Sequence, residues 1–92
     1  MTADSVGPVL EAGEVAAAII VAIREANEEV TVQDRGAYVR VLVPGRCIVR
    51  RDAIERALGR TFVFPGDLER AMPSFKGMLR IDTDEVEWAW RR

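Results

Sequence analysis

The sequence predicts a single-domain α+β sandwich in which a mostly antiparallel sheet packs with three helices, in the order β-α-β-β-β-α-α-β-β. Three stretches predict this class. Val30–Arg51 holds short β-rich runs separated by turn residues, Gly13–Ala26 repeats apolar residues at three- and four-residue steps, and Lys76–Trp90 alternates apolar and polar residues around a turn. A chain of 92 residues is the size of one small domain.

The N-terminal part predicts a tail, a strand and the longest helix. Residues 1–5 form a flexible tail, and Val6–Glu11 form the strand. Pro8 has no N–H for a ladder, so we expect this strand to lie at a sheet edge or to begin late. The helix over Gly13–Ala26, ended by Asn27, carries an apolar stripe wider than one sheet face needs. Its excess is either additional core, which we favour, or an exposed contact face.

The central stretch predicts an antiparallel meander. Its β-rich runs are Val30–Val32, Ala37–Val43 and Cys47–Val49. Between them lie two turn signals that contain Gly36 and Gly45, and glycine can take the positive φ that a tight reversal needs.

Two short helices and a hairpin are expected to follow. Asp52–Leu58 is the first helix, and Gly59 is its stop. The second begins at Pro65, which suits a first helical position, and ends before Pro73. Lys76–Asp82 and Val86–Trp90 then form the hairpin, and its two tryptophans can bury roughly 150–250 Å² each. This hairpin should therefore close the core.

Composition excludes several classes of function. The formal net charge of −2 argues against nucleic acid or an anionic membrane as the partner, since each needs a clustered basic face. The absence of histidine removes the usual general base and the commonest imidazole metal ligand. The single cysteine, Cys47, is favoured as a buried, unreactive thiol over a nucleophile. The N-terminus does not resemble a signal peptide, and Val15–Ile23 is too short to span a bilayer, so we expect a cytoplasmic protein.

Motifs for chemistry within the chain are weak. Asp82, Asp84 and Glu85 look like part of a calcium loop, but the pattern around them is incomplete and a solvated turn is favoured. The glycines lack the spacing of a phosphate-binding fingerprint, and neither Ser5 nor Ser74 lies in a nucleophile elbow. A carboxylate pair for acid–base catalysis stays open. The pattern as a whole points to a protein that acts by binding another protein.

Four segments, taken together in order and spacing, resemble a known family. Val6–Val9, Val30–Val41, Leu58–Arg60 and Ser74–Gly77 are similar to the effector proteins of soluble di-iron multicomponent monooxygenases, the MmoB/DmpM family. The likeness is closest to the toluene and alkene monooxygenase branch, and Asp34–Arg40 is its most specific part. It covers nearly all of an effector domain that we place at residues 6–92.

The resemblance implies a non-catalytic regulatory subunit without a cofactor. Such a subunit docks on a hydroxylase near its di-iron centre and couples electron transfer and O₂ activation to hydroxylation or epoxidation of an aromatic or alkene hydrocarbon. It competes or alternates with a Rieske ferredoxin or a reductase, and it is monomeric when free. The alternatives are an adaptor or assembly domain of another complex and a stand-alone enzyme that uses carboxylates.

Docking residues are expected in the segments that carry the resemblance. Asp34 and Arg35 lie at a turn, where exposed charge can steer association. Arg40 is either a docking charge or an ordinary solvent-facing residue, Tyr38 is either core or contact, and Phe75 is either an aromatic anchor or core. The complete set of candidates is Val6, Gly7, Pro8, Asp34, Arg35, Tyr38, Arg40, Ser74, Phe75 and Lys76.

Overall fold

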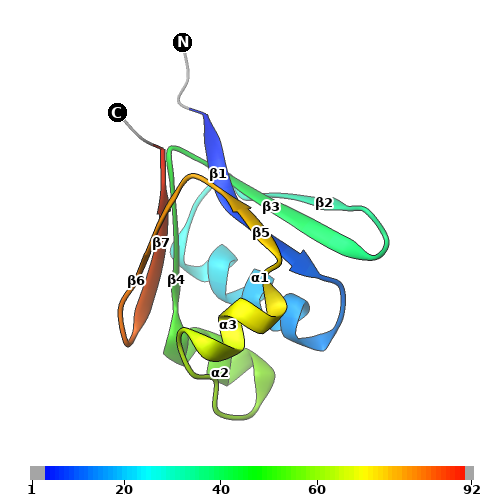
Figure 1. Cartoon of the computed structure of the whole chain (residues 1–92), viewed down its shortest axis with the longest axis vertical. Coiled ribbons are helices and arrows are strands. Elements are labelled where there is room, and N and C mark those ends of the chain that lie inside the picture. The colour runs from blue at the N-terminus through cyan, green and yellow to red at the C-terminus, as the bar shows by residue number, and fades with distance from the viewer. Residues whose placement is uncertain (1–3, 91–92) are drawn as a thin grey trace.

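The computed structural model describes residues 4–90 and confirms the α+β class with three helices (Figure 1). The elements are β1 (Ser5–Glu11), α1 (Glu14–Ala26), β2 (Thr31–Asp34), β3 (Tyr38–Pro44), β4 (Arg46–Arg50), α2 (Arg51–Leu58), α3 (Gly66–Ala71), β5 (Ser74–Lys76), β6 (Met78–Ile81) and β7 (Glu85–Ala89). The order is β-α-β-β-β-α-α-β-β-β, one strand more than predicted, because a strand begins already at Ser74 and Gly77 separates it, as β5, from β6 in the expected stretch Lys76–Asp82.

The strands form two antiparallel sheets. The first has the order β2-β3-β1-β5, and the second has the order β4-β7-β6. In Figure 1 the two sheets spread apart from a shared corner at the top, and the three helices lie between their open ends. Each sheet therefore turns one face toward the helices.

The predicted meander is wrong in its second half. β2 and β3 form the expected hairpin, but β4 pairs with β7 instead of β3. Gly45, with φ of 76°, turns the chain from the first sheet into the second. Its N–H donates to the carbonyl of Asp4 at 3.0 Å, and its own carbonyl accepts from the N–H of Trp90 at 2.9 Å. These long-range bonds make the Pro44-Gly45 turn a corner between sheets.

A second glycine forms the matching corner between β5 and β6. Gly77 has φ of 109°, which L side chains rarely adopt. A Cβ atom at this position would lie 2.8 Å from Cγ1 of Val6 and 3.0 Å from the carbonyl oxygen of Ala89. Both the conformation and the space therefore require glycine here.

β1 lies inside its sheet, between β3 and β5, so the expected edge position is wrong. Its hydrogen-bonded ladder to β3 is interrupted at Gly7 and Pro8, and Pro8 has no N–H to donate. A Cβ atom on Gly7 would lie only 2.2 Å from the carbonyl oxygen of Val41, so glycine is needed for this close approach. Ser5 belongs to β1 and Asp4 is hydrogen-bonded, so neither is part of a tail, and residues 1–3 lie outside the described residues.

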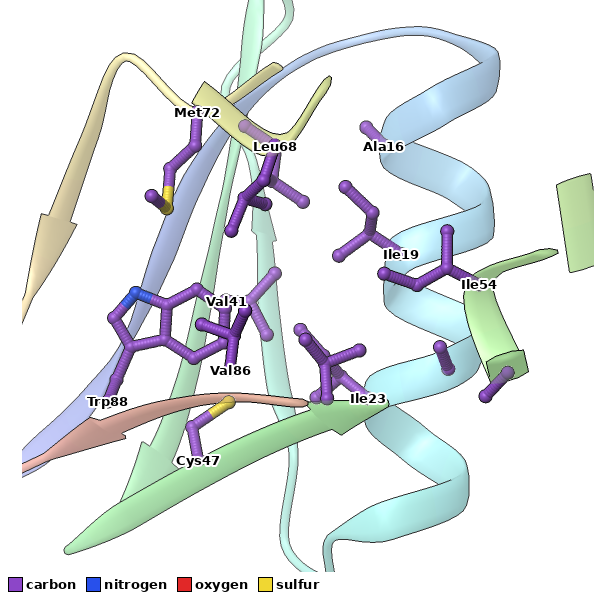
Figure 2. Close-up of a cluster of buried hydrophobic side chains, with 14 of the residues drawn as sticks. Ala16, Ile19, Ile23, Val41, Cys47, Ile54, Leu68, Met72, Val86 and Trp88 are labelled. Carbon is purple, nitrogen blue, oxygen red and sulfur yellow. The ribbon is translucent and has the colours of Figure 1, made fainter. Parts of the chain in front are cut away.

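The core lies between the sheets and the helices (Figure 2). Trp88 is its largest fully buried side chain, and Ile19 and Ile23 of α1 reach it from the opposite side. The additional apolar residues of α1 are divided: Ala16 is buried and Ile20 packs against the core, whereas Ala17 and Val21 are exposed, so the favoured interpretation holds for only half of them. Cys47 is buried, as predicted, and this burial raises the pKa of its thiol to about 12.

Candidate docking surface

One face of the four-stranded sheet has no helix against it. Val39, Val41 and Val43 of β3 point into the core, so the alternate residues of this strand point outward. Strand register extends the alternation across the sheet: Arg40 lies opposite Gln33 on β2 and opposite Val9 on β1. We call this outward side of β2, β3, β1 and β5 the open face. Figure 1 shows all three helices on the other side of the sheet.

Four of the predicted docking side chains lie on the open face. Tyr38 and Arg40 come from β3, and Ser74 and Lys76 come from β5. Tyr38 is 40% exposed, so its interpretation as a core residue is wrong. Arg40 is exposed as well, and it projects from the middle of the face.

The two charged residues of the turn between β2 and β3, Asp34 and Arg35, make different contacts. The carboxylate of Asp34 accepts the N–H of Gly36 at 2.8 Å, so it stabilises the turn. Nη2 of Arg35 donates to Oε1 of Gln33 at 3.4 Å, which brings the guanidinium to the side of the open face. Arg35 is therefore available to a partner, and Asp34 supports the loop that carries it.

The remaining predicted residues contribute no side chain to the open face. Three of them belong to β1, which lies between β3 and β5, and all three are buried: Val6, Gly7 and Pro8. Phe75 pairs with Pro8, so it lies on the core-facing side at the sheet edge, where it remains 42% exposed. It is neither a core residue nor part of the open face.

An aromatic corner next to the open face was missed by sequence reasoning. Trp90 is 40% exposed, although alternation with Trp88 predicted its burial. Nζ of Lys76 lies 6.0 Å from the centroid of the Trp90 ring, a cation–π contact. β7 ends at Ala89, so alternation no longer governs Trp90, which is tied to the corner at Gly45. The only signal in the sequence was the position of Trp90 at the end of its run.

One carboxylate of the second sheet pairs with two arginines. Glu87 of β7 accepts from Arg46 of β4 and, at 3.2 Å, lies next to Nη2 of Arg80 on β6. The bond from Arg46 is the main reason that the pKa of Glu87 lies below its usual range. These three residues form a charged ladder across all three strands of this sheet.

The described residues offer no arrangement for chemistry. No group of three or more His, Cys, Asp or Glu side chains within residues 4–90 could hold a metal ion. A hollow between the start of α1 and the α2–α3 link carries Arg60 and Arg70, but these pair with Glu14 and Asp67. The pKa of Asp67 is lowered chiefly by the bond from the N–H of Val63. No helix of the described chain has the length and apolarity needed to cross a membrane.

This fold defines a small α+β protein with one exposed sheet face. Residues 4–89 match the sequence model of the MmoB/DmpM family. Over 93 residues, covering 99% of this chain and 91% of the relative, the chain is 41% identical to the alkene monooxygenase system effector subunit of Xanthobacter autotrophicus (strain ATCC BAA-1158 / Py2). The chain belongs to the MmoB/DmpM family of monooxygenase effector proteins. It is thus a non-catalytic regulatory component of a multicomponent monooxygenase, which removes the carboxylate enzyme as an alternative.

Two solved structures of a phenol hydroxylase–regulatory protein complex contain similar chains. The first has a TM-score of 0.81 at 21% identity and covers 95% of this chain and 98% of that chain. The second has a TM-score of 0.75 at 24% identity and covers 91% of this chain and 99% of that chain. At these identities the likeness shows that nearly the whole fold is shared.

Proposed function

We propose that this protein binds the di-iron hydroxylase of its monooxygenase near the metal centre and couples electron transfer and O₂ activation to hydrocarbon oxidation. The observation that carries the proposal is the 41% identity to an alkene monooxygenase effector subunit over 99% of the chain. The substrate class that this relative supports is an alkene, oxidised to an epoxide, and an aromatic hydrocarbon is the second possibility.

The protein acts on the hydroxylase through its surface. A binding partner can shift a conformational equilibrium only by its differential affinity for the two states. The effector therefore binds more tightly to the hydroxylase conformation that is competent for O₂ activation, and it raises the population of that conformation. The open face suits this task, since every strand of its sheet is paired and the two central strands, β1 and β3, are buried on the core side.

Electrons reach the hydroxylase from another component. The chain has no histidine, and its one cysteine is buried, so it has no ligand set for an iron–sulfur cluster. A Rieske ferredoxin or a reductase delivers the electrons and alternates with the effector on the hydroxylase. The free effector is a monomer, because its exposed apolar side chains, such as Val21 of α1 and Met78 of β6, are scattered over different elements.

A turnover assay tests the proposal. The hydroxylase of the same system, purified without effector, is supplied with its electron donors, NADH and an alkene, and epoxide formation is measured with and without this protein. We expect the protein to raise the rate and the epoxide formed per NADH. A complex on size exclusion without any change in rate, coupling or product ratio would instead identify an adaptor.

A further inference from the structure

Unpaired cations gather at the open face. The described residues contain nine ion pairs, and none of them involves a residue of the open face. Four cations within residues 4–90 have no carboxylate partner: Arg24, Arg35, Arg40 and Lys76. Three of these four lie on or beside the open face, whereas Arg24 lies on α1. The distribution is therefore concentrated on one side of the molecule.

The three cations are spread across the sheet. Arg40 is on β3 and Lys76 is on β5, with β1 between them, so their strands are about 10 Å apart. Arg35 lies in the turn between β2 and β3, and its guanidinium donates to Gln33 of β2. The register places one carboxylate on the outward rows of these strands, that of Glu11, opposite Tyr38 at the end of β1. Internal pairing on this face is thus absent among the described residues, although the chain has more acidic than basic residues.

We infer that the open face docks on an acidic patch of the hydroxylase, whose carboxylates pair with Arg35, Arg40 and Lys76. This inference rests on the proposed function and adds the surface and the chemistry of its partner. Exposed cations that lack a carboxylate partner within the chain remain free to pair with carboxylates on another molecule, and they raise the rate of association. Tyr38 and Trp90, both partly exposed beside these cations, supply flat aromatic contact area.

A protein partner fits this face better than a polyanion. Nucleic acid and anionic membranes attract proteins through larger basic clusters, and they would repel the acidic residues of this chain, whose net charge is −2 as a whole. A small acidic patch on a protein can pair with the three cations. The acidic residues elsewhere on the effector then stay away from the negative charge of the partner.

Neutralising the three cations tests the inference. The triple variant Arg35→Gln, Arg40→Gln, Lys76→Gln is compared with Arg24→Gln, which removes an unpaired cation outside the open face. The effector concentration that gives half-maximal stimulation of the hydroxylase is measured for each. We expect the triple variant to need at least about tenfold more protein and to reach the wild-type maximal rate, while Arg24→Gln stays near wild type. Circular dichroism and thermal melting confirm that each variant is folded.

Salt dependence gives a second readout. The association rate of the wild type should fall steeply between about 20 mM and about 300 mM NaCl, and that of the triple variant should change little. Equal weakening by Arg24→Gln, or no weakening by the triple variant, would overturn the inference while leaving a stimulating wild type intact. Failure of the wild type to stimulate at all would count against the proposed function instead. Loss of binding to anionic vesicles or to an oligonucleotide, with stimulation unchanged, would assign the cations to those polyanions.

Discussion

The two tryptophans show how strongly the role of a side chain depends on its position. Trp88 is 0% exposed and fills the centre of the core, whereas Trp90, two residues later, is 40% exposed at the corner between the sheets. The indole nitrogen of Trp88 has no hydrogen-bond partner among the described residues, so its burial is favoured by packing alone. Trp90 contributes to the surface beside Lys76.

Truncation of the two tryptophans should therefore have unequal effects. Trp88→Ala leaves a large cavity and should lower the free energy of unfolding by about 3–5 kcal/mol. That is a large part of the roughly 5–15 kcal/mol that holds a small domain together. Trp90→Ala, the matched control, should cost less than about 1 kcal/mol because the ring is already partly solvated. Urea titration followed by circular dichroism measures both, and equal losses would contradict this assignment of the core.

At the level of elements, Asn27 joins the end of α1 to the edge of the second sheet. Its Nδ2 donates to the carbonyls of Ile23 and Ile48 at 2.7 Å each, and its Oδ1 accepts the N–H of Ile48 at 3.1 Å. β4 is an edge strand, so this side chain satisfies backbone groups that would otherwise be open to another strand. The sequence identified Asn27 only as a helix end.

Removal of this amide should loosen the attachment of β4. Asn27→Ala leaves the part-buried N–H and C=O of Ile48 without this partner and should cost about 1–3 kcal/mol. Amide hydrogen exchange should also become faster at Ile48. Gln33→Ala removes a half-buried amide whose bond to Arg35 is long, 3.4 Å, and it serves as the control, with an expected change below about 0.5 kcal/mol. Unchanged exchange at Ile48 would show that β4 is held by other contacts.

The charged ladder of the second sheet predicts a pH dependence. The pKa of Glu87 is lowered in the folded protein, mainly by Arg46, so this carboxylate stabilises the fold above its unfolded pKa of about 4.3. The stabilisation is lost as the pH falls through the lower, folded-state pKa. Glu87→Gln should therefore destabilise the protein near pH 7, by no more than about 1 kcal/mol for such exposed pairs, and cost little near pH 3. A penalty that is the same at both pH values would contradict the ion-pair explanation.

Sequence patterns predicted the elements better than their connections. The β2–β3 hairpin and the three helices follow from local signals that the structure confirms. The corner at Gly45 could not be distinguished from a hairpin turn, because its character depends on bonds to Asp4 and Trp90, far away in the chain. Pro8 suggested an edge strand, but the interruption in the β1–β3 ladder accommodates it.

The alternation of buried and exposed residues in β3 is sufficient to predict part of the open face. Three inward valines in β3 already place Tyr38 and Arg40 outward, so the exposure of Tyr38 could have been predicted. The pairing of the other charges could not have been predicted from the sequence, because Arg46, Arg80 and Glu87 come together only when three separate strands align. The concentration of unpaired cations therefore becomes visible only in three dimensions.

The whole molecule presents a firm surface without reactive groups of its own. Two glycine corners set the directions of the two sheets, and one continuous core joins both sheets to the helices (Figure 2). In the proposed function, such a domain influences an oxidation by changing the conformation of the component to which it binds. Its effect should depend on the stoichiometry of a complex, because it does not turn over.

A titration of the hydroxylase with this protein tests that claim most directly. Product formation and NADH consumption are measured while the effector is increased at a fixed hydroxylase concentration well above the dissociation constant. We expect both the rate and the product formed per NADH to rise and to level off near one effector per active site. A flat titration, or substrate conversion by this protein without the hydroxylase, would contradict the account.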